Sequence, residues 1–343
     1  MKAAGRTPAR RRLARENADR QGAALVPSLV PSAHPKYDES KRDAVNEHLL
    51  VETEEVMKMG KENLDAKRPV ALVTGASSGF GLLVSVTLAR RGYRVAATMR
   101  NVAAREHLLE RAVRDGVGEL IETMPLDVTK PESIELAVAA VTERYGRIDA
   151  LVNNAGMAVG GFVEDVPMER FREQLETNFF GLVAVTKAVL PHMRERRSGC
   201  IVNVSSISGR SAFPGYSAYA ASKFAVEGFS ESLRLEMRPY GVRVVLIEPG
   251  AYRTAIWQKG FDTICTSATS PYREPLARVL RYSRQAAQAA PDPREVADRI
   301  AGVVALSNPS LRYPLGRGAK IALRAKALLP WNLYERVLLR ILN

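Results

Sequence analysis

Between residue 69 and about residue 310, short apolar runs alternate with longer segments of helical periodicity. The runs at 69–74 and 200–204 are continuous and rich in β-branched residues, which is typical of parallel strands buried on both faces. The pattern predicts a single doubly wound α/β domain with a parallel sheet of seven strands and helices on both faces. The expected strands are 69–74, 94–98, 121–126, 148–152, 200–204, 242–247 and 311–313. Helices are expected over 82–89 and 170–189, with further helix starts near 131, 219 and 292.

The two ends of the chain depart from this pattern. Residues 1–67 combine an arginine-rich start, Pro27, Pro31 and Pro35, and mixed charge with few aromatic residues, which predicts a disordered extension; a start at Met57 or Met59 is an alternative. Residues 319–342 form a basic amphipathic pattern broken by Pro330. Such a segment suits either peripheral contact with a membrane or packing over a pocket or a subunit partner. The expected organisation is the extension 1–67, a domain over 68–310 with a substrate lid at about 251–290, and a last strand and basic segment over 311–343.

Composition narrows the classes of function. The formal net charge is +13, but residues 1–69 carry about +3 of it and residues 311–343 about +6, so the basic character lies at the ends. No nucleic-acid motif accompanies it, and we expect no nucleic-acid partner. Two cysteines form no disulfide framework, which suits a reducing, cytoplasmic compartment, and no apolar run reaches the ~20 residues of a transmembrane helix. The four histidines fall in no metal-ligand cluster, so we expect no metal.

A group of polar residues follows the apolar run at 200–204. Tyr219 and Lys223 stand four residues apart at the start of a predicted helix, so their side chains share a face. A nearby ammonium favours the phenolate and would bring the phenol pKa, ordinarily about 10, toward neutrality. Ser206, at the strand end, can hydrogen-bond the same substrate oxygen. The three side chains indicate carbonyl or alcohol chemistry, whereas the spacing of the pair by itself would also suit a solvated helix face.

A glycine-rich loop follows the first predicted strand. Gly75, Gly79 and Gly81 have the spacing G-x-x-x-G-x-G and precede an apolar helix. Glycines let backbone amides approach a pyrophosphate closely, and the start of a helix favours its negative charge. The loop therefore predicts a dinucleotide cofactor.

Five motifs in order carry a resemblance to a known family: Thr74-Gly75-x-x-x-Gly79-x-Gly81, Asn153-Asn154-Ala155-Gly156, Ser206, Tyr219-x-x-x-Lys223 and Pro249-Gly250. With them the chain resembles the short-chain dehydrogenase/reductase family over roughly residues 68–310, in particular its branch of hydroxysteroid and retinol dehydrogenases. The resemblance implies a Rossmann-type fold, a homodimer or homotetramer, and an oxidoreductase that interconverts an apolar ketone or aldehyde and its alcohol. A non-catalytic regulator that binds NADP(H) through the same fold is the alternative.

The resemblance also implies roles for individual residues. Tyr219 would exchange the hydroxyl proton, Ser206 would orient the substrate oxygen, and Lys223 would lower the tyrosine pKa and hold the nicotinamide ribose. Asn178, in a predicted helix where asparagine is unfavourable, would support a water connecting Lys223 to solvent; a surface asparagine is the alternative. Asn153 is expected to be structural. The expected cofactor contacts are Gly75, Ser77, Ser78, Gly79, Phe80, Gly81, Arg100, Asp127, Val128, Asn154, Ala155, Gly156, Tyr219, Lys223, Pro249, Gly250, Tyr252 and Thr254.

The end of the second predicted strand bears on the choice of cofactor. An acidic residue there would hydrogen-bond the ribose of NAD, whereas a nearby arginine accommodates the 2′-phosphate of NADP. This strand ends in Thr98-Met99-Arg100, so we expect NADP(H) to be preferred, with Arg100 at the phosphate and NAD(H) possible. An exposed loop arginine is the alternative for Arg100. Asp127, after the third strand, would meet the adenine amino group or cap the next helix.

The predicted lid over 255–290 contains four large aromatic residues. Its mixed aromatic and aliphatic content suits an apolar substrate, although the same side chains could pack on the core. The aromatic residues are Trp257, Phe261, Tyr272 and Tyr282.

Overall fold

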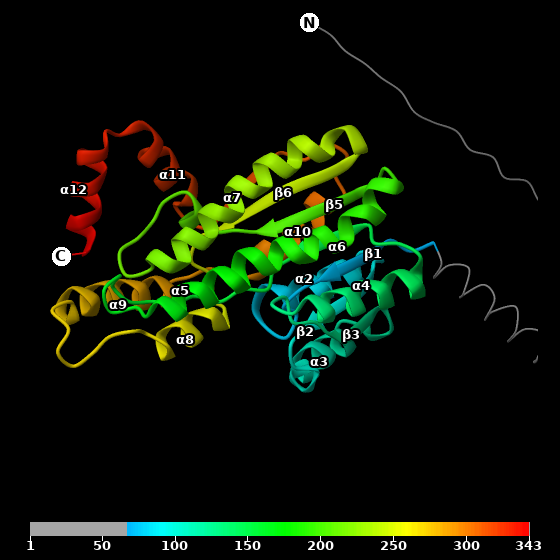
Figure 1. Cartoon of the computed structure of the whole chain (residues 1–343), viewed down its shortest axis with the longest axis horizontal. Helices are drawn as coiled ribbons and strands as arrows, with labels where there is room; N and C mark the ends of the chain where they lie inside the picture. The colour runs from blue at the N-terminus through cyan, green and yellow to red at the C-terminus, as the bar shows by residue number, and fades with distance from the viewer. Residues whose placement is uncertain (1–66, 343) are drawn as a thin grey trace, which may run out of the picture. The chain divides into compact units, whose positions relative to one another are not determined.

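The computed structural model describes residues 67–342, so the predicted extension, apart from Lys67, lies outside the described residues. The strands are β1 (Val70–Val73), β2 (Arg94–Met99), β3 (Ile121–Pro125), β4 (Ala150–Asn153), β5 (Gly199–Val204), β6 (Val242–Pro249) and β7 (Arg312–Leu315). They form one sheet in the order β3-β2-β1-β4-β5-β6-β7, and all neighbouring pairs are parallel (Figure 1). The prediction of a seven-stranded parallel sheet is confirmed.

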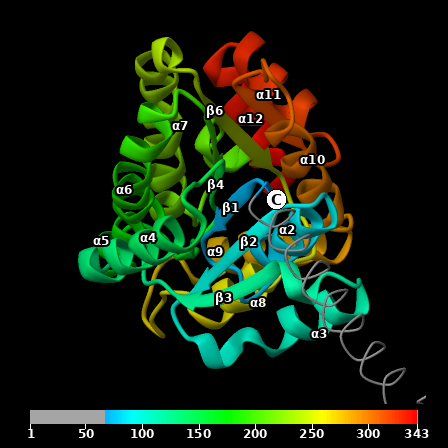
Figure 2. The same ribbon diagram turned by 90° about the vertical axis from the view of Figure 1, so that its right-hand side faces the viewer.

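Helices cover both faces of this sheet (Figure 2). One face carries α2 (Gly79–Arg90), α3 (Glu106–Arg114) and α10 (Arg294–Val304); the other carries α4 (Pro131–Tyr145), α6 (Gly181–Glu195) and α7 (Ser217–Met237). Successive side chains of a strand point to opposite faces. Thus Val73 joins the core cluster under α2 and α10, while Leu72 joins the cluster under α4 and α6.

The remaining elements lie mostly in the connections. The short helical turns are η1 (Val102–Arg105), η2 (Gly118–Leu120), η4 (Ile207–Gly209) and η5 (Arg238–Tyr240). The predicted lid contains α8 (Ala255–Asp262) and α9 (Arg273–Gln288), and the chain ends in α11 (Ala319–Leu328) and α12 (Trp331–Leu342). The break between the last two helices at Pro330 agrees with the sequence pattern.

The predicted helix over 170–189 is present, but a π-helical segment interrupts its α-helical turns. α5 (Met168–Leu175) is joined to α6 by a π-helical segment, η3 (Glu176–Phe180), which contains Asn178. α6 then continues past Pro191 to Glu195. π segments within α-helices are uncommon and often mark functional sites. A local insertion of this kind barely disturbs the apolar periodicity, so the pattern does not reveal it.

The order of the strands reverses direction at β1, which pairs with both β2 and β4. In open α/β sheets, ligands bind outside the carboxyl ends of the strands at this kind of point. The glycine loop after β1 and the Asn154 loop after β4 meet there.

Candidate active site

The glycine loop after β1 is shaped for close approach of a ligand to its backbone. Gly75 and Gly79 have φ values of +68° and +60°, which glycine adopts without strain. A Cβ atom at Gly81 would lie 2.3 Å from the carbonyl oxygen of Gly75. Ser78, the N-cap residue of α2, makes no side-chain capping hydrogen bond. The amides at the start of α2 are therefore left uncapped by that side chain, as an anion-binding helix terminus requires.

The loop after β4 is tied directly to the glycine loop. The backbone amides of Asn154 and Ala155 each donate to Thr74 Oγ1 at 3.0 Å. The Asn154 side chain donates to the carbonyl oxygens of Thr74 and Gly75 at 2.9 and 3.1 Å. Asn154 thus holds the two loops together. The role of Thr74 was missed at the sequence level, and its hydroxyl at the end of an apolar strand was the available signal.

Asn153 lies one residue earlier, inside the sheet. Its Nδ2 donates to Thr186 Oγ1 on α6 and to Asn203 Oδ1 on β5, both at 2.9 Å. The expectation that Asn153 is structural is confirmed. These bonds fix the end of β4 against its neighbours.

The structure brings Ser206, Tyr219 and Lys223 together. Ser206 follows β5, and its Oγ donates to the carbonyl of Pro249 at 3.3 Å and accepts from the amide of Ser208 at 3.1 Å. On the first turns of α7, Lys223 Nζ lies 5.8 Å from the ring centroid of Tyr219. The same ammonium donates to the carbonyl of Val204, the last residue of β5, at 2.8 Å.

Burial dominates the protonation of this group. It raises the pKa of Tyr219 above its ordinary value of 10, and the hydrogen bond with Ser206 opposes the shift. It also lowers the pKa of Lys223 to about 8, against the attraction of Glu227. The net shift of the Tyr219 pKa is therefore upward and not downward as expected, because desolvation is the largest influence on the phenol. At neutral pH Tyr219 carries its proton.

Asn178 lies inside the protein, so the alternative of a surface asparagine was wrong. It is 1% exposed; its Oδ1 accepts from the amide of Met157 at 2.9 Å, and its Nδ2 donates to the Met157 carbonyl at 3.0 Å and to Ser222 Oγ at 3.2 Å. Gln174, one turn earlier, donates to the same Met157 carbonyl at 2.9 Å. Both amides anchor the loop after β4, and their spacing of four residues could have indicated Gln174.

The loop after β6 lies over the glycine loop. A Cβ atom at Gly79 would be 3.7 Å from the Cβ of Thr254, which places Thr254 beside the predicted phosphate site. Tyr252 is directed into the core: it is 1% exposed, meets the ring of Phe80 edge-on at 5.7 Å and donates to Glu295 Oε2 at 2.9 Å. Only the backbone of Tyr252 is thus left to contact a cofactor.

Arg100, Asp127 and Val128 lie at the ends of β2 and β3. Arg100 is exposed and makes no hydrogen bond or ion pair with any other residue in 67–342. Asp127 Oδ1 accepts from the amide and the hydroxyl of Thr129 at 3.0 and 2.8 Å. The alternative that Asp127 caps the next helix was wrong, because Lys130 is the N-cap residue of α4. Val128 is buried against Gly181.

The aromatic residues of the predicted lid pack on loops around this site. Tyr282 stacks on Phe213 with ring centroids 5.3 Å apart, and Tyr272 stacks on Phe162 at 5.1 Å. Trp257 Nε1 donates to the carbonyl of Tyr252 at 2.9 Å. α8 and α9 are thereby attached to the loops that follow β4, β5 and β6.

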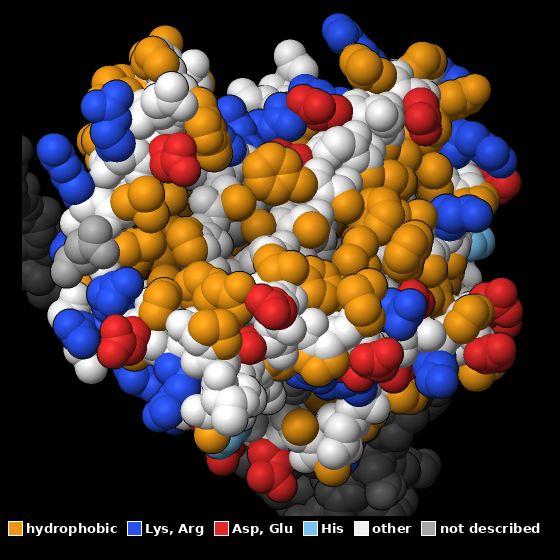
Figure 3. Space-filling model, turned by 60° about the vertical axis from the view of Figure 1, so that its left-hand side comes forward, with side chains coloured by type: hydrophobic (Ala, Val, Ile, Leu, Met, Phe, Trp, Pro, Cys, Tyr) orange, Lys and Arg blue, Asp and Glu red, His pale blue; other side chains and the backbone are white. Residues whose placement is uncertain are grey.

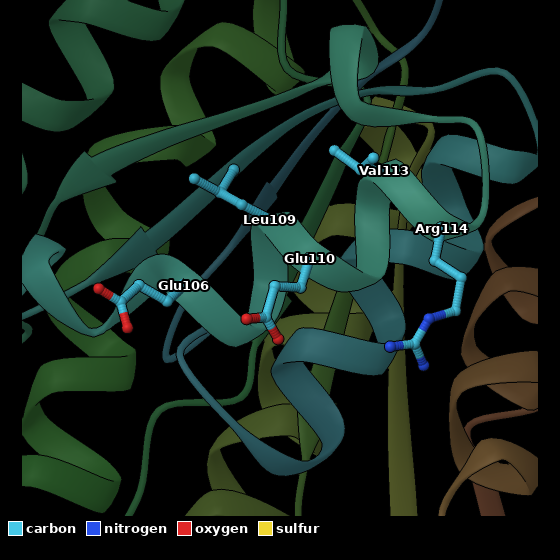
Figure 4. A pocket seen from close by; sticks show the side chains of 5 residues that line it. All are labelled: Glu106, Leu109, Glu110, Val113 and Arg114. Carbon is cyan, nitrogen blue, oxygen red and sulfur yellow. The ribbon is translucent and has the colours of Figure 1, made fainter.

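A separate hollow of about 590 Å³ lies along α3 (Figure 4). It is lined by Glu106, Leu109, Glu110, Val113 and Arg114. These side chains all come from one helix, and Figure 4 shows that they spread along it and do not converge on a point. The hollow contains none of the predicted site residues and is not the candidate site. Within residues 67–342, no group of His, Cys, Asp and Glu side chains could hold a metal ion, and no helix is long and apolar enough to cross a membrane.

Comparison with known proteins decides the family. A family model described as short chain dehydrogenase matches residues 69–264, more than half of the chain. The chain belongs to the short-chain dehydrogenase family. The predicted family is confirmed, and the chain is an oxidoreductase of the kind that acts on alcohol or ketone groups.

Relatives in this short-chain dehydrogenase family include proteins named for different substrates. The uncharacterized oxidoreductase YusZ of Bacillus subtilis is 46% identical, over 79% of this chain and 97% of its own length. The 3-ketodihydrosphingosine reductase of Bacteroides thetaiotaomicron is 35% identical, over 78% of this chain and 96% of its own. The 17-beta-hydroxysteroid dehydrogenase type 1 of Mus musculus is 38% identical, over 71% of this chain and 72% of its own length.

Solved structures of the family share the fold. A short-chain dehydrogenase from Streptomyces avermitilis is 38% identical with a TM-score of 0.67, covering 76% of this chain and 93% of that chain. An alcohol dehydrogenase from Thermococcus sibiricus, complexed with 5-hydroxy-NADP, is 26% identical with a TM-score of 0.60. The match covers 73% of this chain and 97% of that chain. This short-chain dehydrogenase thus has structural neighbours that bind nicotinamide cofactors.

Proposed function

We propose that the protein is an NADP(H)-dependent reductase of an apolar ketone or aldehyde, with Tyr219 as the proton donor. The observation that carries this proposal is the cluster of Tyr219, Ser206 and Lys223: the half-buried phenol is hydrogen-bonded with Ser206, and Lys223 Nζ lies 5.8 Å from its ring centroid. This group lies where the loops at the carboxyl ends of the strands come together. A protonated phenol is the form that the reduction of a carbonyl requires.

Each residue of the group has a separate task in this proposal. When bound, the nicotinamide cofactor supplies or accepts the hydride. Ser206 donates a hydrogen bond to the substrate oxygen and polarises the carbonyl, and Tyr219 gives its proton to that oxygen as negative charge develops. The ammonium of Lys223 then stabilises the phenolate that remains and holds the ribose hydroxyls. Asn178 keeps the loop at Met157 in place and supports a water chain by which the phenolate regains a proton.

The residues present fit a dinucleotide. A side chain at Gly81 would clash with the Gly75 carbonyl and displace the glycine loop, and the side chain of Ser78 makes no capping hydrogen bond to the first turn of α2. We assign the pyrophosphate to this turn and the nicotinamide side to the loop after β6. The cofactor contacts in this proposal are those expected from the sequence, with Asn154 acting indirectly by holding the glycine loop.

Arg100 is the proposed contact for the 2′-phosphate of NADP. Because a charge-assisted hydrogen bond is worth roughly 1.5–3 kcal/mol, Arg100→Ala should raise the NADPH Kd by about 10- to 100-fold and leave the NADH Kd nearly unchanged. Fluorescence titration with both cofactors measures this. Arg105→Ala, another exposed arginine close by, is the matched control. A ratio of NADPH to NADH affinity that stays the same in Arg100→Ala would refute the assignment.

Turnover itself tests the proposed reaction. Purified protein should oxidise NADPH faster than NADH with at least one member of a panel of ketones and aldehydes bearing steroid, retinoid, long-chain acyl or polyketide-like groups. The relatives named for a ketosphingoid and a steroid make the long-chain and steroid members the first choices. NADPH binding without turnover of any member, or preference for small polar carbonyls, would count against the proposal.

Self-association is proposed through the outer side of the α5 to α7 region. Three large apolar side chains are exposed there: Phe180 by 51%, Phe224 by 44% and Leu235 by 71%. Burying such side chains between two copies would be favourable. Sedimentation velocity should give a homodimer or homotetramer that Phe180→Ser together with Leu235→Ser converts to smaller species. A wild-type monomer at micromolar concentration would contradict this.

Peripheral contact with an anionic membrane is proposed for the last two helices. On α11, the exposed Ile321 and Leu328 lie with Arg324 opposite the buried Leu323. On α12, the exposed Leu333, Arg336, Val337 and Arg340 lie on one side. Figure 3, which turns this end of the domain forward, shows apolar side chains across its centre and many Lys and Arg side chains toward its margins. Apolar and basic residues together are what an interfacial helix presents to anionic lipid.

Vesicle flotation tests this contact. The full chain should float with vesicles containing phosphatidylglycerol and much less with phosphatidylcholine alone. Each arginine near a lipid surface is worth about 1 kcal/mol, so Arg336→Gln with Arg340→Gln should weaken binding by more than 10-fold. Val113→Ser, which alters an exposed apolar residue on α3, is the control. Equal flotation of wild type and the double variant would end the proposal and leave packing as the role of these helices.

A further inference from the structure

A group of charged residues is buried behind Lys223, and the proposed reaction does not use it. Glu248 on β6 is fully buried and Glu227 on α7 is 5% exposed. Both approach the same nitrogen, Arg312 Nε on β7, at 3.1 and 2.8 Å. Arg312 also pairs with the more exposed Glu231 at 2.8 Å, and Arg210, after η4, lies 3.5 Å from Glu248. Two carboxyl groups thus share one guanidinium in the interior.

The carboxyl groups are incompletely satisfied. Oε1 of Glu227 and both oxygens of Glu248 are buried without a hydrogen-bond partner among the described residues. The hydroxyl of Ser205, which also lacks a partner, borders this space, because a Cβ atom at Gly209 would lie 2.8 Å from it and 3.0 Å from Cγ of Glu227. Two close buried carboxylates are costly when both are ionised. A proton retained by one of them removes a charge and supplies a donor.

The charges around Glu248 also favour a retained proton. Desolvation and then Glu227 raise the pKa of Glu248 to about 7, while Arg210 and Arg312 oppose the shift. The groups facing this pair are Arg210, Glu231 and Arg312, together with Lys223 one turn before Glu227 on α7. With all groups ionised, three cations face three carboxylates. Of these carboxylates, Glu227 is the one that attracts the buried Lys223 ammonium.

We propose that Glu227 is a positioning residue for the reaction: its carboxylate keeps Lys223 charged, and across Arg312 it makes Glu248 retain a proton. The consequence for catalysis rests on the proposed function, but the effect on Lys223 does not. Glu227 lies four residues after Lys223 on the same face of α7. Among the charged groups near Lys223, it is the one whose attraction opposes the loss of the lysine proton.

The test measures the pKa of Lys223 in cofactor-free protein, by NMR of lysines labelled at Cε, with Lys223→Met identifying the signal. Removing the opposing charge should lower the pKa of Lys223 by about 1 or more in Glu227→Gln. Glu231→Gln, which alters the other α7 carboxylate on Arg312, should change it by less than about 0.3 because that group is 54% exposed. An unchanged pKa in Glu227→Gln would overturn the proposal.

Two further measurements separate electrostatics from damage to the fold. Glu227→Asp keeps the charge, so its Lys223 pKa should remain closer to wild type than that of Glu227→Gln; equal effects of both would also overturn the proposal. In the active enzyme, the upper limb of the pH profile of kcat/KM should move to lower pH in Glu227→Gln. A fall in activity that is uniform with pH would indicate a structural role alone and contradict the proposal.

The proton that Glu248 retains can be tested separately. Because the pKa of Glu248 is raised in the folded protein, its contribution to stability is fully present below about pH 4.5 and is lost as the pH rises through about 7. Relative to Glu248→Gln, the wild type should therefore lose thermal stability between pH 5 and pH 8. A difference in Tm that is constant over this range would overturn the proton on Glu248. Neither this measurement nor the NMR titration requires turnover, so failure of the proposed reaction is recognised separately.

Discussion

Tyr219→Phe should lower kcat for carbonyl reduction by about 10²- to 10⁴-fold while leaving the Kd of NADPH within about twofold of wild type. The substitution removes one hydroxyl from a half-buried ring and leaves the rest of the ring unchanged. Without it, no group beside Ser206 can give a proton to the substrate oxygen: Ser206 donates only a neutral hydrogen bond, and Lys223 is directed to the Val204 carbonyl. As hydride adds to the carbonyl carbon, the substrate oxygen would then have to develop a full negative charge.

Steady-state assays and cofactor titration of the same preparations check this expectation. Tyr240→Phe makes the same chemical change at a tyrosine that is 40% exposed after α7, and it should leave both kcat and Kd unchanged. Retention of more than a tenth of wild-type kcat in Tyr219→Phe would show that another group supplies the proton.

Gly81→Ala should weaken NADPH binding by at least about 100-fold, or ~2.7 kcal/mol. The added methyl group would lie 2.3 Å from the carbonyl oxygen of Gly75 and 2.5 Å from Nδ2 of Asn154. These atoms belong to the hydrogen bond that joins the loops after β1 and β4, so neither can move without displacing the glycine loop. The cost falls on the backbone that is proposed to hold the pyrophosphate.

Gly302→Ala on α10 is the matched control, since no atom outside its own helix lies within 4 Å of the position of an added Cβ. There alanine should stabilise the protein by roughly 0.5–1 kcal/mol through its better helix propensity, with unchanged cofactor affinity. Binding of NADPH by Gly81→Ala within threefold of wild type, in protein with a wild-type circular dichroism spectrum, would disprove the assignment of this loop.

Features that depend on neighbouring residues in the chain were predictable from the sequence. The central strands β1, β4 and β5 were found because a strand buried on both faces is a continuous apolar run. The glycine spacing and the four-residue separation of Tyr219 and Lys223 are likewise local, so the loop, the helix start and the shared face followed directly. The break at Pro330 was also visible, since proline lacks the amide that continues a helix.

Other features arise only when distant segments meet. Burial turned the expected change in the pKa of Tyr219 around, because the desolvation of the phenol depends on every element packed around it. The same packing made Asn178 an internal anchor and inserted a π turn where the apolar spacing indicated a continuous helix. The direction of the Tyr252 ring was likewise decided by α10, which supplies Glu295.

For this protein, then, the order of its elements, its family motifs and the residue types of its proposed chemistry were determined by the sequence, because each depends on spacing within a few turns or one strand. Only the tertiary structure decided which polar groups are desolvated and which charges compensate one another. Glu227, Glu248 and Arg312 come from α7, β6 and β7, and no periodicity along the chain predicts that they share a buried space. Electrostatic coupling depends on distance and dielectric environment in three dimensions, and both are products of packing.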